Sequence, residues 1–305
     1  IFFILFLNII FLPLDFLSDK ALNSIKNITF KKIILGKFFL LIIFLIFSFF
    51  LITIYEKKNL LLFVFYCLIS QVFLLILQGK IIKLFFKTEK FSKDSFVIKT
   101  SEEYLTFNIV FNLFKQMIII PNHWLRNDDK NLKFHLKRFN IYVKERIYLK
   151  SICLASIINL ITYSFVFYYL LEKNHDSLGF IYNFSLLSNL ICFFYILTLP
   201  FISKKGILSI DKRMKNESEL LFKENLEIFE RNQDQNDNRS RLVEMIFYPV
   251  PSTSSRMNCD LSKGFGSPNI SRLIIFLASC FLSIIFKGVH GNAGKPLNWL
   301  LPPSE

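Results

Sequence analysis

The four histidines of the sequence, at positions 123, 135, 175 and 290, are the residues best suited to hold a catalytic metal. A helical zinc peptidase needs two histidines four residues apart, with a glutamate beside the first, so that both imidazoles reach one metal ion. His123 is followed by Trp124 and has Asn127 at the fourth position. The stretch from His135 to Phe139, HLKRF, also lacks the glutamate and the second histidine. The spacing therefore predicts no bound metal at either place.

Other motifs that carry chemistry do not occur either. Neither GxxxxGK[ST] nor GxGxxG is found, so a phosphate-binding loop is not predicted. The five cysteines stand alone, without a CxxC pair, and four of them lie in apolar runs, where a free cysteine behaves as a small hydrophobic residue. We therefore expect no catalytic residue, no cofactor and no disulfide framework.

The polar residues inside the apolar runs are neutral. Asn159 and Asn189 fall near the middle of two consecutive runs, and no Asp, Glu, Lys or Arg occupies such a central position. Because ion and proton pathways usually contain buried ionisable groups, a proton-coupled transporter is disfavoured. We predict that Asn159 and Asn189 make an interhelical hydrogen bond, and a substrate-binding pair is the alternative.

Long apolar runs must position these residues. Residues 148–171 and 178–202 each exceed the roughly 20 apolar residues that a helix needs to cross a bilayer. Only the polar stretch EKNHDS, residues 172–177, separates them, while lysines and arginines crowd the outer flanks. The pattern predicts a membrane hairpin over 148–203, with its flanks in the cytoplasm and its tip outside.

The remaining apolar runs extend this scheme. Runs at 33–55 and 60–78 predict a second hairpin with its tip at 56–59, and residues 1–16 are interpreted as the remnant of a truncated first span. The last run, 270–286, is predicted to be a span, with a re-entrant or interfacial helix as the alternative. The positive-inside rule then places 79–147 and 204–269 in the cytoplasm.

These elements predict an all-α fold, a multi-pass transmembrane bundle of roughly five or six spans with amphipathic cytoplasmic helices. The expected parts are the N-terminal spans 1–78, a basic segment 79–147, the central hairpin 148–203, a helical segment 204–269, and the last span or re-entrant helix with its tail, 270–305. A hydrophobic content of 53% excludes an ordinary soluble domain. The net charge of +14 is explained by the membrane flanks, so no nucleic-acid partner is predicted.

The cytoplasmic segments carry three predicted helices. Tyr104–Ile120 has one narrow polar stripe at helical spacing and stops at Pro121. Residues 132–147 place apolar side chains on one face, and the other faces are expected to contact anionic lipid headgroups through Lys133, Lys137, Arg138, Lys144 and Arg146. Met214–Arg231 is the third predicted helix, with Phe222 and Leu226 on its apolar face.

Residues 197–256 resemble the C-terminal part of the M48 family of membrane-embedded zinc peptidases. In that family a membrane helix leads into a segment with an acidic residue and an Asp-Arg pair, then a helix, then a His-Pro element followed by an arginine. The matching positions here are Asp211 with Arg213, then Tyr248-Pro249 and Arg256. The chain departs from the family in having no HExxH motif, in having Ile207 where the third zinc ligand would precede Asp211, and in having Tyr248 in place of histidine. The resemblance therefore implies a relative without metal or hydrolytic activity.

We expect an integral membrane protein, in a bacterial cytoplasmic membrane, that acts as a non-enzymatic anchor or assembly subunit. Its cytoplasmic face would dock anionic lipid or a partner protein of a membrane complex. A degenerate, inactive M48 relative is one alternative, and a small-solute or lipid transporter that uses the neutral polar residues is the other.

Overall fold

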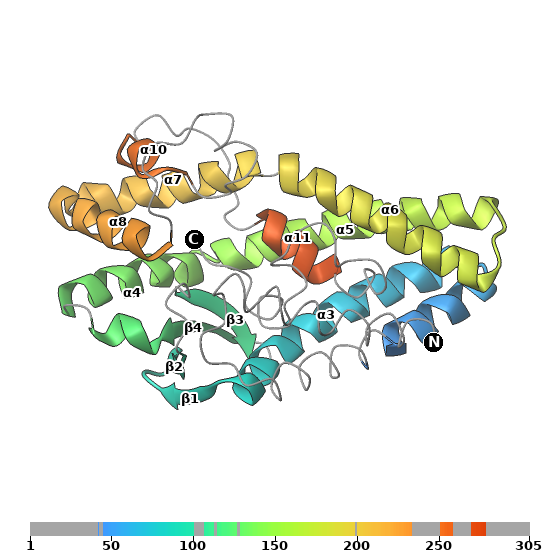
Figure 1. The fold of residues 1–305 in the computed structure, drawn as a ribbon, viewed down its shortest axis with the longest axis horizontal. Coiled ribbons are helices and arrows are strands. Elements are labelled where there is room, and N and C mark those ends of the chain that lie inside the picture. The colour runs from blue at the N-terminus through green and yellow to red at the C-terminus, as the bar shows by residue number, and fades with distance from the viewer. Residues whose placement is uncertain are drawn as a thin grey trace, which may run out of the picture.

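The structure, a computed structural model, describes residues 42, 45–100, 107–112, 115–126, 129–198, 200–233, 251–258 and 270–278. Helices dominate, and the longest of them run along one axis of the elongated molecule (Figure 1). Within the described residues, three helices are long and apolar enough to cross a membrane. The predicted first span at 1–16, the start of the 33–55 run and residues 279–286 lie outside the described part.

The three long helices are α3 (Leu60–Phe85), α5 (Ile147–Glu172) and α6 (Ser177–Thr198), and a shorter apolar helix, Leu45–Glu56, precedes them. α5 and α6 occupy the two arms of the central hairpin that the sequence predicts. Asn59 caps α3, because its side-chain oxygen accepts a hydrogen bond from the backbone N–H of Leu62 at 2.9 Å.

The tips of the two hairpins meet at one end of the molecule. The Tyr55 hydroxyl donates to the carbonyl oxygen of His175 at 2.8 Å, and Lys58 Nζ donates to the side-chain oxygen of Asn174 at 3.0 Å. A third hydrogen bond runs from Ser177 Oγ to Glu56 Oε1 at 2.9 Å. The two tips therefore share one end of the molecule, as the predicted orientation requires.

Aromatic rings fill the bundle behind the tips. Tyr55 stacks on Phe180 with ring centroids 3.8 Å apart, and Phe63 stacks on Phe167 at 4.2 Å. The outward faces of the same helices are also apolar but exposed, which is the pattern of helices surrounded by lipid. The exposed residues include Leu61, Phe65, Ile69, Ile161, Phe165, Leu178, Tyr182, Leu186 and Leu190.

The all-α prediction is wrong in the segment after α3, where the chain forms a four-stranded sheet. Its strands are β1 (Lys87–Lys90), β2 (Ser95–Lys99), β3 (Asn108–Asn112) and β4 (Lys115–Pro121), in the order β1-β2-β4-β3. β2 and β4 are parallel, and the other two pairs are antiparallel. The core side of the sheet is buried against α3 and the bundle.

The helix predicted over Tyr104–Ile120 is replaced by β3 and β4. Asn108 and Asn112 are four residues apart, and this spacing places them on one face of a strand as well as on one face of a helix. The run Ile118–Ile120 decides between the two structures, because β-branched residues fit a buried strand better than a helix. All three isoleucines are buried.

Shorter elements pack at the end opposite the tips. They are η1 (Asn122–Arg126), α4 (Asp129–Lys144), α7 (Pro200–Glu217), α8 (Glu219–Gln233), α10 (Thr253–Met257) and α11 (Ile270–Ala278). The helix predicted over Met214–Arg231 is divided between α7 and α8, because Ser218 interrupts it and its hydroxyl accepts from the N–H of Leu221 at 3.4 Å. α11 packs against α5, α6, α3 and α7.

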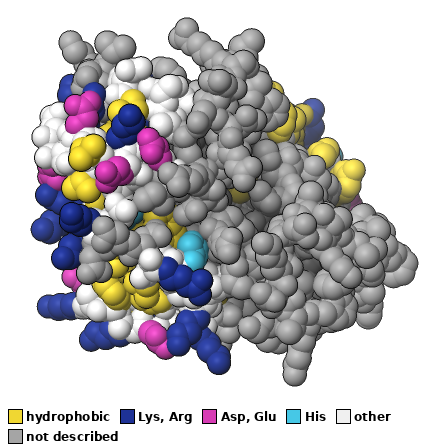
Figure 2. Space-filling model, turned by 60° about the vertical axis from the view of Figure 1, so that its left-hand side comes forward, with side chains coloured by type: hydrophobic (Ala, Val, Ile, Leu, Met, Phe, Trp, Pro, Cys, Tyr) yellow, Lys and Arg dark blue, Asp and Glu magenta, His cyan; other side chains and the backbone are white. Residues whose placement is uncertain are grey.

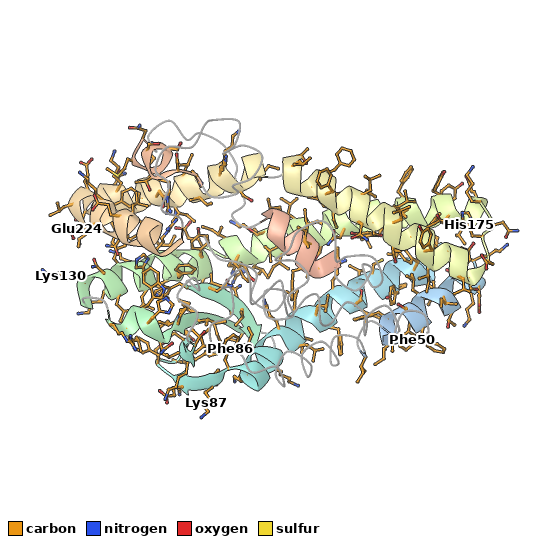
Figure 3. All side chains as sticks on the ribbon, in the orientation of Figure 1. Phe50, Phe86, Lys87, Lys130, His175 and Glu224 are labelled. Atoms are coloured by element: carbon orange, nitrogen blue, oxygen red, sulfur yellow. The ribbon has the colours of Figure 1, made fainter. Side chains whose placement is uncertain are left out.

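α4 does not lie across the ends of the long helices. It runs along the long axis of the molecule and α5 continues in the same general direction (Figure 1), so that Lys130 lies at the end opposite His175 (Figure 3). The helix predicted over 132–147 is therefore present, but it projects away from the bundle.

Candidate functional site

The most concentrated chemistry in the described residues is a buried ion triplet of Arg138, Asp211 and Arg256. Arg138 Nη2 lies 2.8 Å from Asp211 Oδ1. Arg256 approaches the same carboxylate with two donors, Nε at 2.7 Å from Oδ2 and Nη2 at 3.1 Å from Oδ1. The Asp211 side chain has no exposed surface, and only 4% of each arginine side chain is exposed. The three residues come from α4, α7 and α10, so the triplet joins three separate helices.

Local sequence places both arginines. On α4, Leu132, His135 and Phe139 recur at helical spacing and are buried, and Arg138 lies beside them. Arg256 belongs to α10, whose first turn is capped by Ser252, since its hydroxyl accepts from the N–H of Ser255 at 3.4 Å. A short capped helix therefore presents Arg256 to α7.

His135, one turn before Arg138, is enclosed by aromatic rings. It stacks on Phe107 with centroids 5.4 Å apart and meets Trp124 edge-on at 4.8 Å. Burial, assisted by the positive charges of Arg138 and Arg256, lowers the pKa of His135 to about 3. Its imidazole is therefore uncharged at neutral pH.

This arrangement favours a structural role over a catalytic one. The Asp211 carboxylate accepts three charge-assisted hydrogen bonds, which leaves it poorly placed to bind a metal or take a proton. Among the described residues, no group of three or more His, Cys, Asp or Glu side chains could hold a metal ion. The triplet is best described as an electrostatic crosslink between α4, α7 and α10.

The structure brings together two of the positions on which the peptidase resemblance rests. Asp211 and Arg256 are 45 residues apart in sequence and form the bidentate pair. Arg213 instead points to an exposed ion pair with Glu145. Ile207, one turn before Asp211, is buried. Tyr248 and Pro249 lie outside the described residues.

The predicted lipid-contact residues divide into two groups. Arg138 does not lie on the surface, because it is held by Asp211 in the protein interior. Lys133, Lys137, Lys144 and Arg146 are exposed. Lys137 is paired with Glu217 at 2.7 Å, and it belongs with Lys133 to the part of α4 that projects away from the bundle.

Exposed cations lie at the ends of α3 and α5 that are opposite the tips. We call Lys80, Lys83, Lys144, Arg146 and Lys150 the basic belt; all five are exposed, and they lie where α3 ends and α5 begins. Figure 2 shows Lys and Arg side chains on the end of the molecule opposite the tips, with Asp and Glu scattered between them. At the tips, Lys57, Lys58 and Lys173 stand beside Glu56, Glu172 and Asp176, so the basic excess belongs to the belt end.

Asn159 and Asn189 do not bond to each other. The Asn159 side-chain amide donates to the carbonyl oxygen of Ile274 on α11 at 3.0 Å, which is an interhelical bond to a different helix from the predicted one. Asn189 donates to the carbonyl oxygen of Ser185 in its own helix at 2.8 Å. Both side chains are buried.

Arg138 is the site residue that sequence reasoning assigned to the wrong environment. Its neighbours His135 and Phe139 lie on the apolar face of the helix, so a charged residue between them signals a buried partner. The ion-pair partners of Asp211 are distant in sequence, so the local sequence around Asp211 does not indicate that its side chain is buried.

No protein-family model matches the chain, and no match was found among curated proteins or solved structures.

Proposed function

We propose that the chain is an integral membrane protein whose long helices cross a bacterial cytoplasmic membrane, with roughly five or six spans in total. The hairpin tips would face outward, and the sheet, α4, α7, α8 and α10 would form a cytoplasmic domain. The shared location of the two tips supports this orientation, as does the excess of cations at the other end.

The observation that carries the proposal is the distance between the tips and the basic belt. The stretch of α3 from Leu60 to Lys80 contains 21 residues, and the stretch of α5 from Lys150 to Glu172 is of similar length. At a rise of 1.5 Å per residue these stretches span about 30 Å and about 33 Å. They match the thickness of a hydrocarbon core, which is about 30 Å. The belt would therefore lie at the level of the lipid headgroups.

We assign the protein the role of a non-enzymatic membrane anchor that binds anionic lipid through the basic belt. Exposed Lys and Arg side chains at the headgroup level are attracted to anionic lipid by about 1 kcal/mol each. The ion triplet would then hold the cytoplasmic helices in a fixed arrangement on this anchor.

Native mass spectrometry tests this role. The protein is released from nanodiscs that contain both phosphatidylglycerol and phosphatidylcholine, and the amounts of the two lipids that stay bound are compared. The belt variant Lys144→Gln/Arg146→Gln/Lys150→Gln should reduce phosphatidylglycerol binding about tenfold or more. The matched control removes the same charge at the other end, through Lys57→Gln, Lys58→Gln and Lys173→Gln. Equal lipid binding by the two variants would contradict the proposal.

A degenerate relative of the M48 peptidases is the second candidate, and the Asp211–Arg256 pair favours it. The pair joins two positions that were matched to the family from sequence alone. Arg138 completes the triplet and lies in the stretch HLKRF, which begins with His135. In this interpretation, Leu136, Phe139 and Ile207 stand where a glutamate, a histidine and a glutamate would be needed for zinc chemistry.

Restoring those three residues tests the kinship. The variant Leu136→Glu/Phe139→His/Ile207→Glu should bind one zinc ion per chain, measured by elemental analysis of the purified protein, whereas Phe139→His alone should bind much less. A restored variant with no more zinc than the unmodified chain would remove the support for this candidate.

A further inference from the structure

Buried neutral polar side chains lie on α3, α5 and α6. Within the described part of the chain, neither amide atom of Gln71 has a hydrogen-bond partner, although only 2% of the residue is exposed. The hydroxyl of Ser188 and the side-chain oxygens of Asn159 and Asn189 also have no partner there, and all three residues are buried. We call these four residues the polar layer.

The polar layer occupies one depth in the bundle. Gln71 lies about three helical turns beyond the start of α3, and Ser188 lies about three turns beyond the start of α6. Asn159 lies between three and four turns before Glu172, where α5 ends. At 1.5 Å per residue all three are about 16 to 20 Å from the tips, near the middle of the apolar length.

Apolar clusters enclose this depth on both sides. Along α5, Tyr163 and buried residues nearer the tip belong to one cluster, while Ala155 and buried residues nearer the base belong to another. Asn159 is the residue between them. Its amide nitrogen is bonded to Ile274 of α11, and α11 packs against α3, α5 and α6. Asn159 therefore lies where α5 contacts α11, and α11 also contacts the helices that carry Gln71 and Ser188.

Leaving these groups unsatisfied would be costly. A buried polar group without a hydrogen bond costs about 1–3 kcal/mol, and the cost rises in surroundings that contain no solvent. Gln71 offers a donor and an acceptor, Asn159 and Asn189 offer acceptors, and Ser188 offers both. Buried water needs two to four such partners, whereas ion pathways usually contain ionisable groups, and these four residues have none.

We propose that the polar layer is a binding site for water inside the bundle, where water bridges Gln71 to the polar atoms of α5 and α6. The bound water satisfies the amide and hydroxyl groups that have no protein partner. The site takes a neutral, water-sized hydrogen-bonding molecule.

Radiolytic hydroxyl footprinting of the full-length protein in nanodiscs tests the site, because bound water generates radicals next to it. Tyr163 and Cys192 are in contact at 3.3 Å, one turn from Asn159 and Ser188, and both are buried. Each labelling rate is first divided by the rate of the same residue in the unfolded chain. The normalised rates of Tyr163 and Cys192 should be at least about threefold higher than those of Phe63 and Phe167, which are equally buried and nearer the tips. Labelling at the level of these two phenylalanines would overturn the proposal.

A thermodynamic cycle supplies a second measurement. If water bridges Gln71 to Ser188, then Gln71→Met and Ser188→Ala should lower the unfolding midpoint separately but not additively, since either change releases the same water. The control pair is Gln71→Met with Ser70→Ala, because the Ser70 hydroxyl is bonded to the carbonyl oxygen of Cys67 at 3.0 Å; these two changes should add. A rise in the midpoint with Gln71→Met would show a dry layer and overturn the proposal.

Discussion

Replacing Asp211 by asparagine should destabilise the packing of α4, α7 and α10 against one another. The carboxylate is fully buried and accepts from both Arg138 and Arg256. An asparagine keeps one oxygen acceptor, but its amide nitrogen would face a guanidinium group, donor against donor. The variant would therefore remove the carboxylate that balances the charge of the two buried arginines.

The expected magnitude follows from the burial of all three groups. Removing one partner of a buried ion pair typically costs about 3–5 kcal/mol, because a charge remains in the interior without compensation. For a cooperative unit of about 200 residues, this corresponds to a lower melting temperature by about 10 °C. Exposed pairs contribute far less, at about 0–1 kcal/mol.

Tryptophan fluorescence gives a direct assay. Trp124 is fully buried and contacts His135, one turn from Arg138, so its emission reports on the integrity of this region. The only other tryptophan, Trp299, is replaced by phenylalanine in all samples.

Arg213→Gln is the matched control, because it breaks the exposed pair with Glu145 and should lower the free energy of unfolding by no more than about 1 kcal/mol. The apolar replacement Arg138→Met/Asp211→Leu/Arg256→Met should recover much of the loss, since it leaves no buried charge. If Asp211→Asn shifts the midpoint no more than the control does, the triplet is not a structural crosslink.

Three further predictions concern other parts of the fold. Burial lowers the pKa of His135 to about 3, so the unfolded chain binds a proton at this residue first as the pH falls below about 6.5. The free energy of unfolding should therefore fall by about 2 kcal/mol between pH 7 and pH 5. Urea midpoints over this range should depend less on pH in a His135→Phe variant. Asn159→Leu should destabilise the bundle by about 0.6–2 kcal/mol through loss of its bond to α11, whereas Asn189→Leu, which breaks only a bond within α6, should cost less when both are measured in one detergent. A Glu56→Cys/Ser177→Cys protein should be crosslinked by a short bis-maleimide, seen as a mobility shift on denaturing gels, and the absence of a crosslink would contradict the contact between the tips.

The long helices could be predicted from the sequence because hydropathy and length alone determine them. α5 and α6 follow the two apolar runs, and the turn between them follows from a short polar stretch. α4 also follows from its periodic apolar face, although its direction along the molecule could not be predicted, since that depends on packing against α7 and α8.

The sheet and the ion triplet required information that is not local. Asn108 and Asn112 fit a strand and a helix equally well, and the strand is stabilised by pairing with the isoleucine run of β4. Arg138 and Asp211 belong to different helices that are far apart in the chain, so neither residue alone reveals that it is buried. Asp211 and Arg256 are 45 residues apart, and nothing in the local sequence indicates that they form a pair.

Cysteine accessibility in intact cells tests the proposed orientation most directly. In a chain whose native cysteines are replaced, Ser177→Cys marks the tips and Lys130→Cys marks the opposite end of the molecule. A membrane-impermeant maleimide should label Cys at 177 in intact cells, and Cys at 130 only after the membrane is permeabilised. Labelling of both positions in intact cells, or of both only after permeabilisation, would contradict a bundle that crosses the membrane between its tips and its basic belt.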